Sequence, residues 1–219
     1  VSAPSMVASS ASSILTSDTL HHDLWVTLVG FSLSFVVATV GGVLLGVLIG
    51  YSDVAYHLLN PFIVSLNAQP KIVLMPLVIL WFGMGLPSKL FLAGLMAGFP
   101  IIVSTLTGVR SIERDFVLLA RSYQASRFKI FRSILLPSII PFVLSGMRVG
   151  INYGMVGVLL VEFFASNEGV GYRMVLYTAN FQIDLFFVLL FVVIAFTLAC
   201  TAVIERLESR FGRWRPAAF

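Results

Sequence analysis

The chain has 219 residues, of which 58% are hydrophobic and only 11% are charged, with a formal net charge of +4. An average soluble domain carries roughly 25% charged residues, so this composition, with a mean hydropathy of +1.00, excludes an ordinary soluble domain and indicates an integral membrane protein. The single cysteine, Cys200, excludes disulfides and thiolate metal sites, and His21, His22 and His57 lack the spacing of metal ligands.

Apolar runs in chain order predict five membrane spans of about 20 residues each. The first, residues 24–50, contains no charge and is predicted to be one continuous helix. The second, residues 61–82, contains Pro61, Pro70 and Pro76, and we expect its backbone to be kinked or broken where proline removes a hydrogen-bond donor.

Three further runs, residues 89–109, 138–164 and 185–204, complete the predicted spans. The predicted fold class is therefore all-α, a polytopic helical membrane protein. The opening segment, residues 1–23, is small and polar and does not resemble a signal peptide, so we expect it to lie outside the membrane.

Lysine and arginine are distributed unequally between the two ends of these spans. One group comprises Arg110, Arg114, Arg121, Arg127, Lys129, Arg132, Arg206, Arg210, Arg213 and Arg215, and the opposite end has only Lys89 and Arg173. Because basic loops resist translocation, residues 110–137 and the C-terminus are predicted to be cytoplasmic, and residues 1–23 periplasmic.

The basic loop, residues 110–137, is long enough to be structured. Apolar residues recur at helical spacing in two short segments, first Phe116, Leu119 and Tyr123, then Phe128, Phe131 and Leu135. Ser126 is expected to cap the second segment. Such a basic amphipathic segment either lies on anionic headgroups or docks on a soluble partner, and its composition alone leaves both open.

The stretch "ARSYQASRFKIFRSILLP", residues 120–137, resembles the cytoplasmic signature loop of permease subunits in bacterial ABC importers. Ala120 matches the second alanine of the family's Glu-Ala-Ala, and Ile134, Leu136 and Pro137 match its Ile-x-Leu-Pro ending. The resemblance continues in "PLVILWFGMG" at 76–85, "GVR" at 108–110, "LSGMRVG" at 144–150 and "VEFFASNEGVGYRM" at 161–174. Together these segments are similar to permeases of the nitrate, sulfonate and taurine type.

The resemblance implies a type I importer fold, with residues 24–219 as the transmembrane domain and a further N-terminal helix before this chain. It also implies that the loop at 110–137 passes the motion of an ATPase to the membrane helices. The coupling residues would be Ala120, Ser122, Gln124, Ala125, Ser126 and Arg127.

Two positions depart from the family pattern, because Gln124 replaces its glycine and Leu118 its glutamate. A left-handed turn costs an ordinary residue roughly 1 kcal/mol relative to glycine, so the turn at Gln124 is expected to be strained or slightly different. These departures also leave open whether the chain pairs with itself or with a second permease.

No G-x-x-x-x-G-K-[ST] motif occurs, so this chain is expected to be a transport subunit and not an enzyme, without cofactors of its own. By the resemblance, a cytoplasmic ATPase dimer would bind ATP and Mg, and the other partners would be a second permease copy and a periplasmic binding protein. The expected location is the bacterial inner membrane.

Polar residues inside the spans are candidates for the translocation pathway, since they should face protein or water: Lys71, Arg148, Asn152 and Glu162. Arg148 could instead extend toward the inner surface, and it is too far along the helix to pair with Glu162. Glycines four apart, Gly42, Gly46 and Gly50, then Gly146, Gly150 and Gly154, predict close helix packing or, as the alternative, a substrate-lining face.

The alternative function is an autonomous channel or secondary transporter, for which several buried acidic residues would be expected, whereas Glu162 is the only acid in a predicted span. An intramembrane enzyme would need a nucleophile with a base or a metal cluster, and the span cores offer neither. Lys71 and Arg148 would suit a small anion such as a sulfonate, taurine or nitrate, although related permeases also carry neutral heterocycles.

Overall fold

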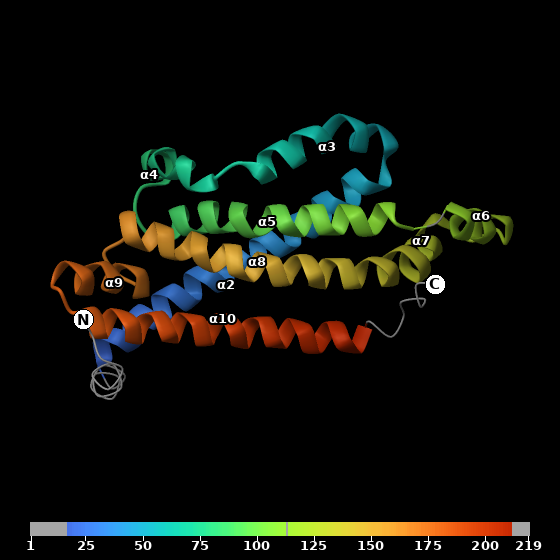
Figure 1. The fold of residues 1–219 in the computed structure, drawn as a ribbon. Coiled ribbons are helices and arrows are strands. Elements are labelled where there is room, and N and C mark those ends of the chain that lie inside the picture. The colour runs from blue at the N-terminus through green and yellow to red at the C-terminus, as the bar shows by residue number, and fades with distance from the viewer. Residues whose placement is uncertain (1–16, 113, 212–219) are drawn as a thin grey trace. The chain divides into compact units, whose positions relative to one another are not determined.

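The computed structural model describes residues 17–112 and 114–211, which form helices joined by short connections (Figure 1). In chain order these are α2 (Asp18–Tyr51), α3 (Asp53–Ala68), the 3-10 helix η1 (Lys71–Leu74), α4 (Met75–Phe82), α5 (Leu86–Arg110), α6 (Arg114–Ser122), α7 (Arg127–Ile130), the π-helical turn η2 (Phe131–Leu135), α8 (Leu136–Phe164), α9 (Val170–Ala179) and α10 (Ile183–Phe211). The first 16 residues of the expected periplasmic segment lie outside the described part.

Four of the described helices are long and apolar enough to cross a membrane, namely α2, α5, α8 with the residues just before it, and α10. They contain the predicted spans 24–50, 89–109, 138–164 and 185–204. Helices α3 and η1–α4 meet the criterion only as an interrupted pair, which would make a fifth span. The backbone is extended at Gln69 and Pro70, so the chain breaks where a proline was expected to break it.

The other two prolines of this segment do not interrupt it. Pro61 lies inside α3, and Pro76 lies in the first turn of α4, where its missing N–H needs no helical partner. Of the predicted breaks, the one at Pro70 is therefore confirmed.

Helix α9 lies between the predicted spans 138–164 and 185–204, where no helix was predicted. Residues 170–179 form a helix that buries Val170, Gly171 and Met174. Val170 and Met174 are four residues apart and therefore lie on one helix face. The glycines and polar residues on either side of this segment are typical of a loop, so the short helix was not predicted from the sequence.

The described chain divides into two compact units, and each is stabilised by its own apolar core. Unit 1 comprises residues 17–38, 70–97 and 151–201. One buried apolar cluster is formed by α4, α5, α8 and the residue after α8, with Met75, Val78, Leu92, Met96, Val161 and Ala165. Gly157 of α8 lies against Ala93 of α5, and a Cβ atom at Gly157 would be only 2.6 Å from the Ala93 Cα.

Unit 2 comprises residues 39–69, 98–150 and 202–211 of the described chain. Gly42, Gly46 and Gly50 of α2 pack against the α5 side chains Ile101, Thr105 and Val109, where added Cβ atoms would come within 2.8, 2.6 and 2.8 Å. Both sets of residues advance by four, so the two helices run parallel along this contact. The prediction of close packing is confirmed for these glycines, and for Gly146, where a Cβ would be 2.8 Å from the Ser104 Cβ.

Candidate functional site

The turn between α6 and α7, residues 120–127, brings the predicted coupling residues together. The amide of Gln124 donates to the Arg121 carbonyl at 2.9 Å, and the amide of Ala125 donates to the Ala120 carbonyl at 3.0 Å. This pair of bonds is the Schellman pattern that ends a helix with one left-handed residue, usually glycine. Gln124 takes that conformation with φ of 56°, so of the two expectations for this position the structure favours the strained left-handed turn.

Two serines complete the 120–127 turn. The Ser126 hydroxyl accepts the Lys129 amide at 3.3 Å, which confirms Ser126 as the cap of the following helix. The Ser122 hydroxyl donates to the Leu119 carbonyl at 2.7 Å. Arg127 begins α7, although its side chain and that of Phe116 lie outside the described part.

Apolar side chains around this turn are exposed. Leu118 is 60% exposed, Tyr123 80% and Phe128 70%. Leu135, at the end of η2, is instead buried beside Val109 and Ile139. The loop is therefore anchored at its α8 end, while the side chains near the turn present an apolar surface that is uncovered in this chain.

The predicted pathway residues occupy different surroundings. Arg148 of α8 forms ion pairs with two glutamates of α10, at 3.7 Å from Nη1 to the Glu205 Oε1 and more closely from Nη2 to Glu208. Its charge is thus balanced within unit 2. Asn152 is exposed on α8, and Lys71 is half-buried at the start of η1.

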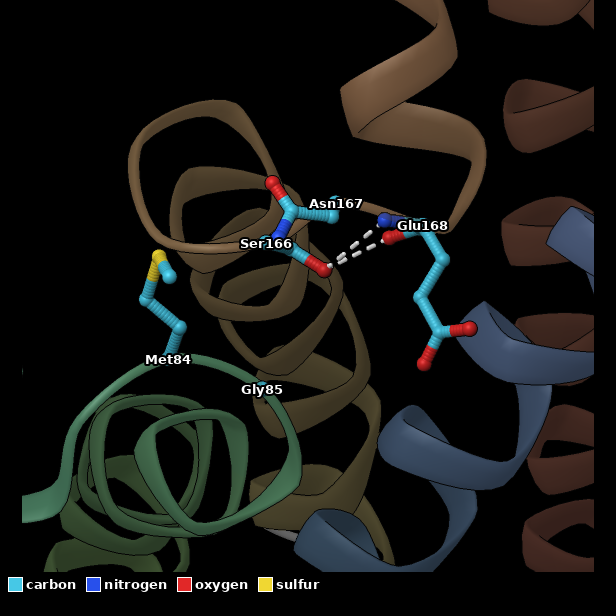
Figure 2. Close-up of a pocket in the computed structure, with 5 residues that line it drawn as sticks. All are labelled: Met84, Gly85, Ser166, Asn167 and Glu168. Carbon is cyan, nitrogen blue, oxygen red and sulfur yellow. Dashed lines mark hydrogen bonds between the residues drawn. The ribbon is translucent and has the colours of Figure 1, made fainter.

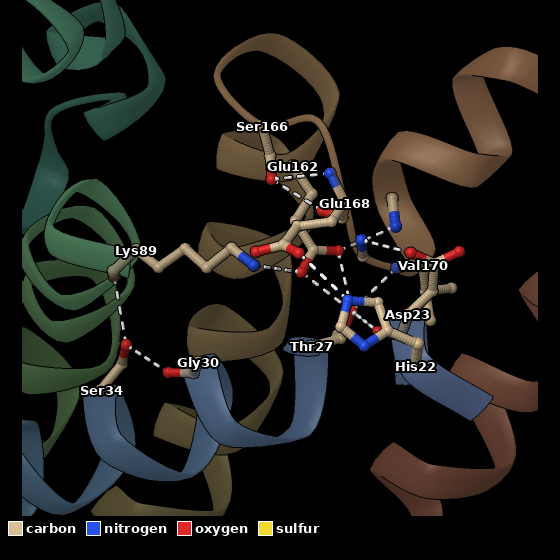
Figure 3. A network of polar contacts seen from close by, with 12 residues as sticks. His22, Asp23, Thr27, Gly30, Ser34, Lys89, Glu162, Ser166, Glu168 and Val170 are labelled. Atoms are coloured by element: carbon tan, nitrogen blue, oxygen red, sulfur yellow. Dashed lines mark hydrogen bonds and ion pairs between the residues drawn. The ribbon is translucent and has the colours of Figure 1, made fainter. Parts of the chain in front are cut away.

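Glu162 of α8 is fully buried and lies in a polar network of unit 1 (Figure 3). The Lys89 Nζ donates to its Oε1 at 2.7 Å, and the Gly171 amide donates to its Oε2 at 2.8 Å. The Thr27 hydroxyl lies 2.8 and 3.0 Å from the two carboxylate oxygens. The structure therefore joins Glu162 to residues that were not predicted as its partners.

A second carboxylate extends this network. The Asp23 Oδ1 accepts the Gly169 amide at 2.8 Å, and its Oδ2 accepts the Arg173 Nε at 2.7 Å. The Thr27 hydroxyl joins the two halves, because it lies 3.0 Å from the Asp23 carbonyl and accepts the Val170 amide at 2.9 Å. Burial raises the pKa of the nearby Tyr177 phenol; the Arg173 charge acts in the opposite direction and the Asp23 charge in the same one.

Sequence reasoning missed Asp23, Thr27, Lys89 and Arg173 as members of one site. Three glycines were the available signal, because each provides room for a charged side chain. A Cβ at Gly30 would be 2.9 Å from the Lys89 Cδ, a Cβ at Gly171 would be 2.7 Å from the Glu162 Cβ, and one at Gly169 would overlap the Glu162 carboxylate. Gly169 also has φ of 106°, which other residues rarely adopt.

A shallow surface pocket lies beside this network, between the loops that precede α5 and α9 (Figure 2). It is lined by Met84, Gly85, Ser166, Asn167 and Glu168. The Gly85 amide donates to the Ala165 carbonyl at 3.0 Å and so ties the two loops together. At its edge the exposed Glu168 carboxylate lies 3.1 Å from the His22 Nε2.

Comparison with solved structures shows the fold. The chain superposes on a structure titled as an inward-facing conformation of the MetNI methionine ABC transporter, with a TM-score of 0.68 and 18% sequence identity. The match covers 89% of this chain and 95% of the other. The architecture is therefore that of a type I ABC importer permease, as predicted.

Curated relatives are permeases from several bacteria. The chain is 29% identical to a probable ABC transporter permease protein of Haemophilus influenzae, over 85% of this chain and 76% of that protein. It is 32% identical to the putative aliphatic sulfonates transport permease SsuC of Escherichia coli, and 31% identical to the riboflavin transport system permease RibX of Chloroflexus aurantiacus. These matches cover 74% and 73% of this chain, but 61% and 59% of the relatives.

A family model matches residues 42–213, which include the 120–127 turn, Arg148 and Glu162. Its description is the binding-protein-dependent transport system inner membrane component. The match extends over most of the chain and agrees with both the fold and the relatives. The chain therefore belongs to the family of binding-protein-dependent transport system inner membrane components.

Proposed function

We propose that this chain forms the translocation pathway of an ATP-driven importer and that the 120–127 turn couples it to a separate cytoplasmic ATPase. The observation that carries the proposal is the exposed apolar surface of Leu118, Tyr123 and Phe128 on an ordered helix–turn–helix. An uncovered apolar surface on structured backbone is typical of a protein contact. Exposed basic residues beside it, Lys129 and Arg132, favour a partner surface that is acidic at its rim.

In the proposed assembly, two ATPase subunits bind ATP and Mg, and two permease chains enclose the pathway. A homodimer is the simpler arrangement, since one chain then supplies both halves. A periplasmic binding protein delivers the substrate from the other side of the inner membrane. The charge asymmetry of the sequence supports a cytoplasmic C-terminus and a cytoplasmic 120–127 turn.

Among the predicted pathway residues, we propose Asn152 and Lys71 as the ones that contribute to the pathway. Asn152 is exposed on a helix predicted to span the membrane, where a polar side chain is expected to face water or protein. The partners of Arg148 and Glu162 instead support roles in holding helices together, on α10 and at α9 respectively.

The substrate class that we propose is a small anion, such as a sulfonate, taurine or nitrate. The supporting observation is that relatives named for aliphatic sulfonates, taurine and nitrate match this chain at 32%, 30% and 28% identity. A neutral heterocycle is the second candidate, because relatives named for riboflavin and formylaminopyrimidine match at 31% and 29%. Uptake of labelled taurine, nitrate and riboflavin by cells that express the transporter distinguishes the two.

The test of coupling is co-purification of the tagged full-length protein with its ATPase in mild detergent. Ala125→Glu places a larger, charged side chain in the 120–127 turn and should abolish ATPase recovery, while the permease still accumulates in the membrane. Gln182→Glu is the matched control, since it adds the same charge at another exposed turn. Full ATPase recovery with Ala125→Glu would contradict the assignment of this turn as the coupling element.

A further inference from the structure

We propose that Asp23, Thr27, Lys89, Glu162 and Arg173 form a charge lock that fixes the beginning of α9 to α2, α5 and α8 within unit 1. The five side chains come from four helices, α2, α5, α8 and α9. Figure 3 shows Asp23, Thr27, Lys89 and Glu162 at the loop that precedes α9, and the Arg173 Nε lies 2.7 Å from the Asp23 Oδ2. In this proposal Lys89 and Glu162 are positioning residues for α9. Glu162 accepts a backbone amide of α9, and Lys89 compensates the buried charge of Glu162.

Burial and pairing favour a lock over an open binding site. Asp23, Lys89 and Glu162 are 1%, 2% and 0% exposed, so their charged groups are closed off from solvent in this chain. The two carboxylates face two cations, because Lys89 pairs with Glu162 and Arg173 pairs with Asp23. Removal of one member of a buried ion pair is strongly destabilising, because it leaves the other charge buried without compensation.

The beginning of α9 is the part of the backbone that this network holds. The amides of Gly169, Val170 and Gly171 donate in turn to Asp23, Thr27 and Glu162. These amides have no partner within their own helix, and the positive end of the helix dipole favours carboxylates beside them. Three successive backbone groups are thus held by side chains of α2 and α8.

The glycines on both sides of this contact make the lock specific. A side chain at Gly169 or Gly171 would occupy the space of Glu162, and a side chain at Gly30 would occupy the space of the Lys89 methylene groups. The backbone of Lys89 is also bound to α2, since the Ser34 hydroxyl donates to the Lys89 carbonyl at 3.2 Å. Both the charged groups and the space for them are therefore built into unit 1.

The consequence for transport rests on the proposed function. If α9 is fixed to α2, α5 and α8, then it moves with them as one body when the importer changes conformation. Loss of the lock should then uncouple α9 from the membrane helices, and transport should fail even though the ATPase remains bound at the 120–127 turn.

The lock itself can be tested without transport, by the reactivity of a cysteine placed in α9. In a Cys200→Ser background, Met174→Cys is the buried reporter, and Val175→Cys is the exposed control, since Met174 is 3% exposed and Val175 is 41% exposed. N-ethylmaleimide is added to the purified full chain in detergent, and labelling is followed by mass spectrometry. The reporter is combined with Lys89→Met, with Glu162→Gln and with both substitutions.

Each single substitution should speed labelling at position 174 by about tenfold, because α9 opens locally when one charge is left unpaired. The double variant removes both charges and keeps an oxygen acceptor for the Gly171 amide, so its labelling should return toward that of the parent. Labelling at position 175 should stay constant throughout. Unchanged protection of position 174 in both single variants would overturn the lock.

Accumulation in the membrane gives a second readout where a single variant fails to fold. The lock predicts that the double variant accumulates better than either single variant, and equal loss of all three would overturn it. In the assembled importer, a single variant that folds should retain ATPase binding and lose substrate uptake. A chain that binds no ATPase at all, but shows the predicted labelling pattern, would retain the lock and refute the proposed function.

Discussion

The left-handed Gln124 allows a direct test of the turn between α6 and α7. We predict that Gln124→Gly stabilises this turn, because glycine adopts a φ of 56° without the steric penalty that a side chain brings. The left-handed conformation costs a non-glycine residue about 1–2 kcal/mol, and glycine avoids this cost. The greater conformational freedom of glycine in the unfolded chain reduces the gain by about 0.5–1 kcal/mol. The net gain should be about 0.5–1 kcal/mol.

Hydrogen exchange of the purified protein measures this gain locally. The amides of Tyr123 and Ala125 donate to Leu119 and Ala120, so they exchange only when the end of α6 opens. A gain of about 0.5–1 kcal/mol should slow their exchange about two- to fivefold. The measurement requires neither substrate nor ATPase.

Gln124→Ala is the matched control, because alanine keeps the left-handed strain and removes only an exposed side chain. Its exchange rates should stay close to those of the parent. If Gln124→Gly exchanged at the parental rate or faster, the backbone at this turn would not be under the strain that the structure indicates. Glycine would then have no advantage over glutamine at this position.

Two further substitutions test the packing and the charge pairing of unit 2. Gly46→Ala should destabilise the protein by about 1–3 kcal/mol in a thermal unfolding assay, because the added Cβ would lie 2.6 Å from the Thr105 Cβ. Gly41→Ala is the control and should be neutral in the same assay, because the space around Gly41 is open. Arg148→Met should cost about 1 kcal/mol, since the half-exposed pair with Glu208 is partly screened, and should leave the KM for uptake unchanged. A large rise in the KM for uptake would indicate that Arg148 contributes to the translocation pathway. Equal melting temperatures of Gly46→Ala and Gly41→Ala would contradict the close approach of α2 and α5.

The membrane-spanning helices could be predicted from the sequence because their signal is local. A long apolar run such as residues 24–50 has to satisfy its own backbone hydrogen bonds in lipid, and only a helix does so within one segment. The same reasoning located the break at Pro70, but it could not separate Pro70 from Pro61. Pro61 lies inside α3 and does not end the helix. Whether a proline ends a helix depends on where in the helix it lies, and composition does not give that position.

The 120–127 turn was predictable for a different reason. Its residues are adjacent in the chain, so the motif itself specifies the geometry that the structure shows at Gln124 and Ser126. Helix α9 was not predictable in this way. Its buried face depends on contacts with residues far away in the sequence, and its flanking glycines indicate a turn when they are considered alone.

Lys89 and Arg173 illustrate how the missed network bears on the orientation of the chain. These two basic residues lie at the ends of the spans that are predicted to face the periplasm, where positive charge is disfavoured. Each is paired inside unit 1, Lys89 with Glu162 across 73 sequence positions and Arg173 with Asp23 across 150. Their presence at that end therefore has an internal cause, since they compensate buried carboxylates that hold α9. Of the basic residues at the other end, Lys129 and Arg132 are exposed, whereas Arg110 forms an ion pair with Asp53. The predicted orientation therefore follows from the unequal number of basic residues at the two ends and not from whether they are paired.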